Sequence, residues 1–186
     1  MMQEEAANSL PAQWKSSRLR EFQARLLDRI GEARDGIGMR DSRLGVVVGE
    51  RHYLLDLREA SEIVNPMPVT KVPLTKDWYL GLANVRGNLI GVVDLDRFFG
   101  GELQARSKDN RVIVVSAALS GTAGFVVSRV LGLRHLQEMS PQEDEDGGDV
   151  SEIIKGKRYL DRSRQEWVEI SLAAVINDAR FLQVGL

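Results

Sequence analysis

Short apolar runs separated by turn residues dominate this chain from residue 43 onward. The first two runs, residues 46–48 and 52–55, flank a tight turn that contains Gly49. Such runs between Gly, Pro and Asn residues predict β-strands. We expect further strands at residues 62–64, 69–72, 80–85, 89–93, 111–117, 122–128, 130–136, 158–160 and 167–170. Many short strands at this spacing favour small β-barrels over a parallel sheet.

Helical spacing occurs near both ends of the chain. It predicts a helix near residues 16–35, whose single apolar stripe consists of Leu19, Phe22, Leu26 and Ile30. This stripe either packs on the protein's own core or binds a partner. Residues 94–99 predict a helical turn, and residues 172–181 predict a closing helix.

The same pattern predicts the domain organisation. We expect an N-terminal extension at residues 1–40 and one domain at residues 41–182. Neither half of that domain is large enough to be stable alone, so two barrels would share apolar surface. We expect the first mainly from residues 43–100 and the second mainly from residues 108–182. The acid-rich segment 137–150 predicts a mobile loop.

Composition excludes several classes of protein. The chain of 186 residues has no cysteine, which excludes disulfides and thiolate metal sites and fits a reducing compartment. Its net charge of -2 provides no overall field for nucleic acid or anionic lipid. The N-terminus lacks the apolar core of a signal peptide, and no apolar run approaches the ~20 residues of a membrane span. We therefore expect a cytoplasmic protein without direct membrane insertion.

A search for catalytic groups finds little. His52 and His135 lie on separate predicted strands, and Asp94 and Asp96 stand where acids cap a helix. The acids near Gly147 do not match the spacing of a calcium loop. The sequence therefore predicts no catalytic residue, no cofactor and no metal site.

Small barrels often bind nucleic acid, and this is the alternative function. The best candidate region is residues 155–164, which is basic and lies close to Tyr159 and Trp167. Glu166 and Glu169 interrupt the basic patch, and Trp167 is better explained as a core residue.

The most informative segment, residues 78–95, reads Trp-Tyr-Leu-Gly-Leu-Ala-Asn-Val-Arg-Gly-Asn-Leu-Ile-Gly-Val-Val-Asp-Leu. It has an aromatic residue, a glycine, an Asn-x-Arg-Gly turn and an apolar strand that ends in Asp-Leu. In this order, the segment resembles the CheW family. Residues 53–57, 62–64 and 124–130 resemble other parts of the same family, so that the resemblance covers roughly residues 43–182.

The resemblance implies a mainly β fold of two intertwined five-stranded SH3-like β-barrels, here with an N-terminal and a C-terminal helix. It also implies an adaptor that links the cytoplasmic tip of a methyl-accepting chemoreceptor to the regulatory domain of a CheA-type histidine kinase. The N-terminal extension, Gly91 in place of a common proline and Ser128 in place of a common aspartate depart from the minimal family pattern. Together these features resemble the branch that controls type IV pilus twitching motility.

The resemblance also implies the protein-binding residues: Arg86, Glu62, Asn84, Gly87, Ile63 and Val64. Ala60 lies on the same early segment as Ile63 and Val64, and these three are the weaker candidates. Gly87 supplies the backbone freedom of a turn, and Gly81 allows close backbone approach in a strand. Arg86 presents a planar fork of donors. It either binds a carboxylate or carbonyl of a partner or pairs with an acid of its own domain such as Glu62, and one charge can do both in turn.

Overall fold

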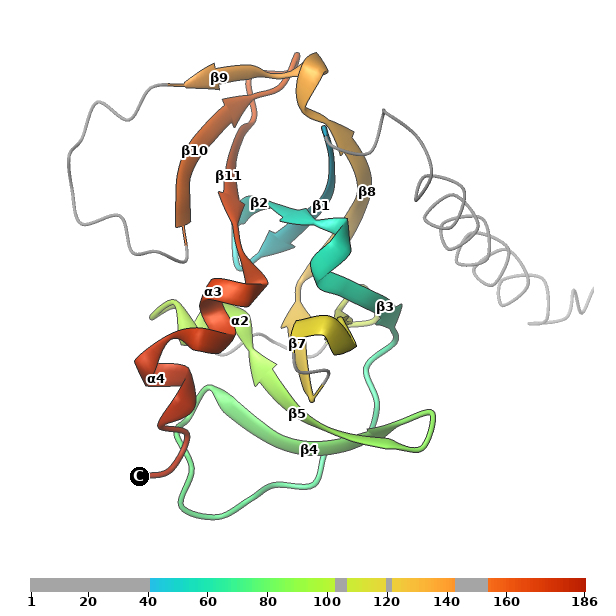
Figure 1. The fold of residues 1–186 in the computed structure, drawn as a ribbon, viewed down its shortest axis with the longest axis vertical. Coiled ribbons are helices and arrows are strands. Elements are labelled where there is room, and N and C mark those ends of the chain that lie inside the picture. Colours follow the sequence, from blue (N-terminus) through green and yellow to red (C-terminus); the bar gives the residue numbers. More distant parts are fainter. Residues whose placement is uncertain (1–40, 103–106, 120–121, 143–153) are drawn as a thin grey trace, which may run out of the picture. The chain divides into compact units, whose positions relative to one another are not determined.

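The computed structural model describes residues 41–102, 107–119, 122–142 and 154–186 (Figure 1). The helix expected near residues 16–35 and most of the acid-rich loop lie outside these ranges.

The described residues form a mainly β structure of two sheets. The first sheet has the order β8 (Arg129–His135), β1 (Ser42–Val48), β2 (Arg51–Asp56), β11 (Glu166–Ile170), β10 (Ile154–Leu160) and β9 (Ser140–Gln142). The second has the order β3 (Ala60–Val64), β6 (Arg111–Val115), β7 (Ala123–Val127), β5 (Asn88–Asp94) and β4 (Tyr79–Val85).

The two sheets do not follow the order of the sequence, because strands from both halves of the chain share the first sheet. We expected barrels mainly from residues 43–100 and 108–182 with strands partly exchanged, and β1 and β2 lie in the same sheet as the late strands β8 to β11. The exchange depends on two parallel pairs, β2 with β11 and β5 with β7. Parallel neighbours need long connections, so each pair joins strands that are far apart in the sequence. Figure 1 shows β1 and β2 beside the orange and red strands.

Three expectations about individual elements were wrong. The first sheet has six strands instead of five, because β9 pairs with β10 inside the segment expected to be a loop. Residues 69–72 form no strand, and only Thr70 makes an isolated bridge, to Leu82. Pro68 and Pro73 flank this segment and cannot donate backbone hydrogen bonds.

The third error concerns the closing helix, which is two short helices, α3 (Leu172–Asn177) and α4 (Ala179–Leu182). Asp178 between them is extended and accepts a hydrogen bond from the backbone N–H of Arg180. An aspartate that caps the second helix in this way interrupts the first. The turn expected at residues 94–99 is confirmed as α2 (Leu95–Phe98), with the Asp94 side chain as its cap.

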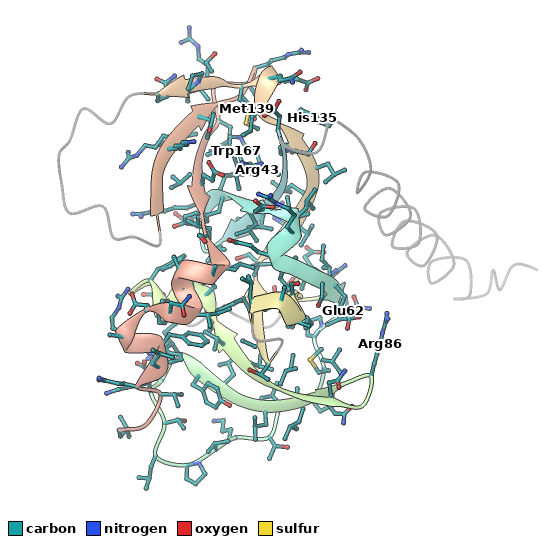
Figure 2. All side chains as sticks on the ribbon, in the orientation of Figure 1. Arg43, Glu62, Arg86, His135, Met139 and Trp167 are labelled. Atoms are coloured by element: carbon teal, nitrogen blue, oxygen red, sulfur yellow. The ribbon has the colours of Figure 1, made fainter. Side chains whose placement is uncertain are left out.

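Aromatic side chains join the C-terminal helices to the second sheet. Phe181 of α4 stacks on Trp78 with ring centroids 5.8 Å apart, and also contacts Phe98 and Phe125. The interior of the first sheet is built separately around Leu54, Met139, Tyr159 and Trp167. Figure 2 shows Met139 and Trp167 inside that sheet. Among the described residues, no helix is long and apolar enough to cross a membrane.

Asp56 is the last residue of β2 and caps the 3-10 turn η3 (Leu57–Glu59), through which the chain leaves β2 for the second sheet. Burial alone would raise the pKa of Asp56, but hydrogen bonds from the side chain and backbone of Arg58 outweigh it and hold this pKa below its ordinary value. A lowered carboxyl pKa contributes stability above the unfolded-state pKa, and this contribution is lost as pH falls through the folded-state pKa.

We therefore expect Asp56→Asn to be less stable than the wild type at pH 7. The difference should narrow as pH falls below about 4, the ordinary range for aspartate. Urea unfolding of both proteins at several pH values measures this difference in the free energy of unfolding. Because the two proteins are compared at the same pH, the titration of all other groups cancels. A difference that does not change with pH would contradict this assignment.

Candidate protein-binding surface

The turn between β4 and β5 is a two-residue hairpin loop. Val85 pairs with Asn88, so only Arg86 and Gly87 form the loop, one residue fewer than the sequence suggested. Arg86 has a φ of 50° and Gly87 a φ of 90°. Positive φ at both positions is the signature of a type I′ turn, whose twist matches that of the flanking strands. A Cβ atom at Gly87 would meet no atom within 4 Å, so glycine is needed there for the backbone conformation and not for lack of space.

Asn84 stabilises the turn from the end of β4. Its side-chain Oδ1 accepts a hydrogen bond from the backbone N–H of Gly87 at 2.8 Å. This bond satisfies a donor that the hairpin ladder does not use, and it holds the residue that follows Arg86. Asn84 and Gly87 therefore shape the turn, and Arg86 is the group that the turn presents.

Arg86 and Glu62 form an ion pair, with Nε of Arg86 3.1 Å from Oε2 of Glu62. The pair connects β3 and the β4–β5 turn, which belong to opposite ends of the five-stranded sheet. The side chain of Arg86 is 73% exposed and that of Glu62 only 19%. Figure 2 shows Arg86 projecting outward from the turn between β4 and β5, near Glu62. The internal pairing considered from the sequence is therefore present, and the guanidinium stays accessible.

The remaining predicted residues divide between the faces of β3. Val64 packs against the apolar cluster that contains Val85 and Ile90, on the same face as Glu62 by strand alternation. Ile63 points to the other face and pairs in the ladder with the buried Ile113. Both are half-buried, as is Ala60. Ile63 and Val64 thus do not present one common surface.

Comparisons with known proteins show the family to which this chain belongs. The CheW-like domain profile matches residues 43–180. Protein PilI of Pseudomonas aeruginosa is 31% identical over 151 residues, which cover 78% of this chain and 80% of PilI. The chain belongs to the CheW-like domain family.

Two further relatives extend the comparison. The chemotaxis protein CheW of Helicobacter pylori is 32% identical over 110 residues, which cover 56% of this chain and 66% of that protein. The crystal structure of the scaffolding protein TtCheW from Thermoanaerobacter tengcongensis superposes with a TM-score of 0.61 at 24% identity, over 75% of this chain and 94% of that one. This likeness shows that the CheW fold is shared.

One exposed residue of this CheW-like domain was missed from the sequence. Leu89 pairs with Asn84 across the hairpin and is 62% exposed. The signal was available, because Ile90 and Val92 point into the core and alternation then places Leu89 outside. A large apolar side chain on the outer side of this hairpin adds contact area next to the charge of Arg86. We call Asn84, Arg86, Gly87 and Leu89 the hairpin tip.

The basic region of the first sheet lacks the aromatic platform that single-stranded nucleic acid needs. Trp167 is 1% exposed and Tyr159 8% exposed, so neither ring is available for stacking. Arg158 pairs with Glu166 at 3.3 Å, which reduces the local positive charge. These observations count against the alternative function.

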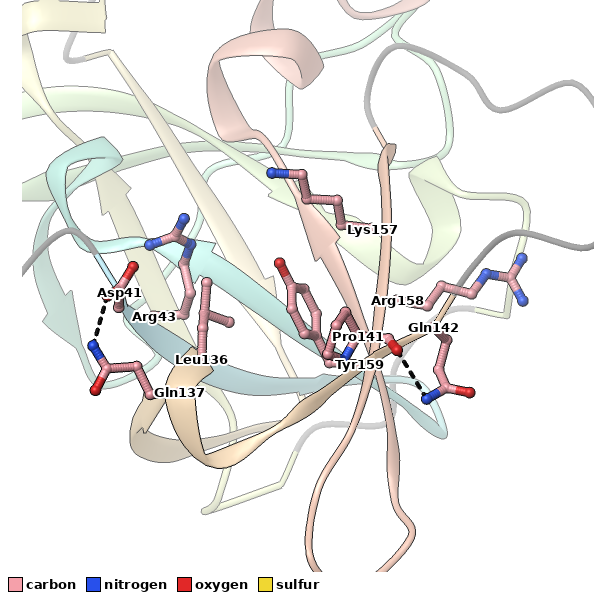
Figure 3. Close-up of a pocket in the computed structure, with 9 residues that line it drawn as sticks. All are labelled: Asp41, Arg43, Leu136, Gln137, Pro141, Gln142, Lys157, Arg158 and Tyr159. Atoms are coloured by element: carbon pink, nitrogen blue, oxygen red, sulfur yellow. Dashed lines mark hydrogen bonds between the residues drawn. The ribbon is translucent and has the colours of Figure 1, made fainter.

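The first sheet also contains an open cavity of about 570 Å³. Figure 3 shows Arg43 and Tyr159 on its wall, with Lys157 and Arg158 beside them.

Metal ligands and the two histidines are a separate question. Among the described residues, no three His, Asp or Glu side chains are placed to hold a metal ion. His52 lies edge-on to Trp167. Burial is the main cause that lowers the pKa of His52, and the positive charge of Arg129 lowers it further. His135 is separate from His52 and lies 3.1 Å from the hydroxyl of Ser42.

Proposed function

We propose that this chain is a coupling adaptor that links a methyl-accepting chemoreceptor to the regulatory domain of a CheA-type histidine kinase. Membership in the CheW-like domain family supports this function, and the similarity to PilI over most of both chains supports a role in type IV pilus twitching motility. An adaptor of this kind works by binding and needs no catalytic group.

The observation that carries the proposal is the accessible guanidinium of Arg86 at the tip of a rigid hairpin. The type I′ turn and the Asn84 side chain fix its backbone, so little conformational entropy is lost when a partner binds. Glu62 holds the side chain from one side, and the exposed donors remain for a carboxylate or carbonyl of the kinase. Arginine is among the residues that most often carry binding energy at interfaces.

The other predicted residues take supporting roles. Glu62 orients Arg86, and Asn84 with Gly87 shapes the turn. Val64 supports β3 from the core, and Ile63 does so from the opposite face. In this proposal residues 41–182 are the coupling domain, and residues 1–40 are an extension that contributes to partner choice.

Replacement of Arg86 tests the proposal. We expect Arg86→Ala to weaken binding to the regulatory domain of a CheA-type kinase by roughly 30-fold, the effect of losing a central anchor of about 2 kcal/mol. Arg86→Lys keeps the charge but not the planar fork, so it should restore only part of the affinity. Isothermal titration calorimetry with the purified kinase domain measures both variants.

Arg180→Ala is the matched control. Arg180 pairs with Asp178 at 2.9 Å, and the two side chains are 58% and 18% exposed, close to the values for Arg86 and Glu62. This variant removes a similar surface ion pair away from the hairpin tip, and its affinity should equal that of the wild type. Wild-type affinity in a folded Arg86→Ala protein would refute the assignment of Arg86.

The pilus branch needs a separate test in cells. Deletion of the gene should reduce twitching and leave flagellar swimming intact, and the wild-type copy should restore twitching. Loss of swimming with normal twitching would instead assign the adaptor to flagellar control.

A further inference from the structure

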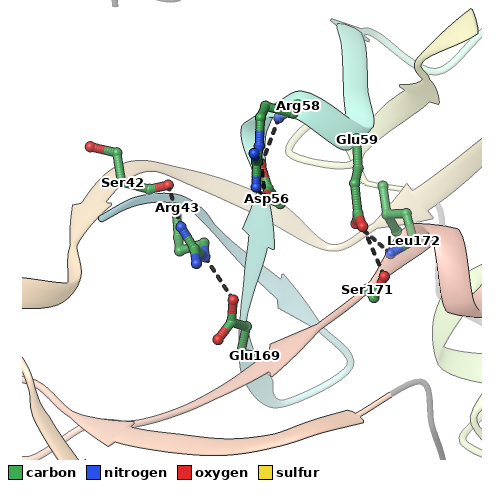
Figure 4. Close-up of polar contacts among 8 residues, drawn as sticks. All are labelled: Ser42, Arg43, Asp56, Arg58, Glu59, Glu169, Ser171 and Leu172. Atoms are coloured by element: carbon green, nitrogen blue, oxygen red, sulfur yellow. Dashed lines mark hydrogen bonds and ion pairs between the residues drawn. The ribbon is translucent and has the colours of Figure 1, made fainter. Parts of the chain in front are cut away.

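The chain passes from one sheet to the other after β2 and after β7, and a third passage, after β11, leads from the first sheet to helices α3 and α4, which pack on the second sheet through Phe181. The first passage is η3, which ends at Glu59, and the third begins at Ser171. These two passages are far apart in the sequence but meet in space. Figure 4 shows the Glu59 side chain pointing at Ser171 and Leu172.

One carboxylate joins the two passages. Oε1 of Glu59 accepts a hydrogen bond from the hydroxyl of Ser171 at 2.8 Å, and Oε2 accepts one from the backbone N–H of Leu172 at 2.6 Å. Hydrogen bonds to an ionised acceptor are shorter and stronger than neutral ones. Ser171 is 6% exposed and Leu172 is fully buried, so both donors are shielded from water. Without Glu59 they would lose their partner.

Glu59 is itself held in place on the opposite side. Its backbone carbonyl accepts a hydrogen bond from Ser116 at the end of β6, at 2.8 Å. The buried side chain of Leu57 anchors the turn, and Asp56 caps it. The residue therefore ties together β6 of the second sheet, the passage out of β2 and the passage out of β11.

We infer that Glu59 is a positioning residue that fixes the orientation of the two sheets relative to each other. This inference rests on the proposed function for its consequence: a receptor that contacts the first sheet would be coupled through Glu59 to a kinase bound at the hairpin tip of the second sheet. The carboxylate supplies two acceptors to two donors. In Glu59→Gln the carbonyl can still accept from the Leu172 N–H and the amide N–H can donate to the hydroxyl oxygen of Ser171, so both contacts stay but lose the strength that the charge gives them, whereas alanine removes both.

Distance measurements by electron spin resonance test the inference directly. The chain has no cysteine, so Thr70→Cys, beside β4, and Gln165→Cys, just before β11, provide one label next to each sheet. Both positions are exposed and hydrogen-bonded through the backbone, Thr70 to Leu82 and Gln165 to Asp161. We expect one narrow distance distribution in the doubly labelled parent, a broader one with Glu59→Gln and the broadest with Glu59→Ala.

Arg58→Ala is the matched control, because Arg58 lies in the same turn and pairs with Asp56 without contacting Ser171 or Leu172. Its distribution should stay narrow. Hydrogen exchange supplies a second readout: protection of the Leu172 amide should fall by about tenfold or more in Glu59→Ala, the scale of a lost hydrogen bond to a charged group. An unchanged distribution together with unchanged protection in Glu59→Ala would overturn the inference.

Kinase assays then separate this inference from the proposed function. If Glu59→Gln binds the kinase and the receptor as the wild type does but no longer transmits receptor control to kinase activity, Glu59 acts in coupling. Normal receptor control in a Glu59→Gln protein with a broadened distribution would refute the coupling role. If the wild type binds neither partner, the proposed function fails, and the distance measurement still decides whether Glu59 orients the sheets.

Discussion

Gly81→Ala should destabilise the protein by at least about 3 kcal/mol. Gly81 has a φ of 130°, a conformation that residues with a side chain rarely adopt. A Cβ atom built there would also overlap the backbone carbonyl of Thr70. Strain and overlap therefore act together at this position.

The overlap cannot be relieved cheaply. Thr70 and Leu82 exchange two backbone hydrogen bonds of 2.8 Å, which hold the segment around Thr70 against β4. To accommodate a methyl group, that segment must move away and lose these bonds. The edge of β4 would then lose the segment that covers it, next to the hairpin that presents Arg86.

Gly100→Ala separates the two contributions. Gly100 also has a positive φ, 88°, but a Cβ there would meet no atom within 4 Å. This control carries the backbone strain without the overlap and should cost about 1 kcal/mol. Urea unfolding followed by tryptophan fluorescence measures both variants. Equal losses of stability in the two would show that the contact with Thr70 has no energetic importance.

Arg43→Met should cost about 3–5 kcal/mol, because it leaves the carboxylate of Glu169 buried and unpaired. Nε of Arg43 donates to Oε1 of Glu169 at 2.8 Å, and the two side chains are 13% and 2% exposed (Figure 4). The other carboxylate oxygen, Oε2, is also buried and has no hydrogen-bond partner among the described residues. Glu169 thus depends on this arginine.

The double variant Arg43→Met with Glu169→Leu provides the control. Replacement of a whole buried ion pair by apolar side chains of similar size is often neutral. We therefore expect the double variant to recover most of the stability that Arg43→Met loses, when both are measured by urea unfolding. If the double variant is as unstable as the single one, the cost comes from lost packing and not from the unpaired charge.

Several parts of the fold and of the candidate surface could be predicted because they depend on neighbours in the sequence. The hairpin at residues 80–93, the Asp94 cap and the role of Gly87 follow from alternation and from local backbone needs. The close backbone approach at Gly81 was also predicted and is confirmed, although its neighbour Thr70 could not be named. Leu89 could have been found by the same alternation.

Other parts could not be predicted, because they join residues that are distant along the chain. Arg43 and Glu169 are 126 positions apart, and Glu59 and Ser171 are 112 apart. The short strand β9 exists only because β10 offers it a partner, and its composition alone is that of a loop. The membership of β1 and β2 in the sheet of the late strands likewise follows from pairing with β11 and β8.

By itself, the sequence determined that the chain is mainly β, that Arg86 stands at a glycine-containing turn and that the segment around it resembles CheW. The first two properties follow from side-chain period and local turn chemistry, which act over a few residues, and the third is a likeness of motif order. Only the tertiary structure decided that Glu62 pairs with Arg86 across the ends of one sheet, and that Glu59 joins the passages between the two sheets. Such contacts depend on which strands meet, and the packing of the whole domain selects that arrangement.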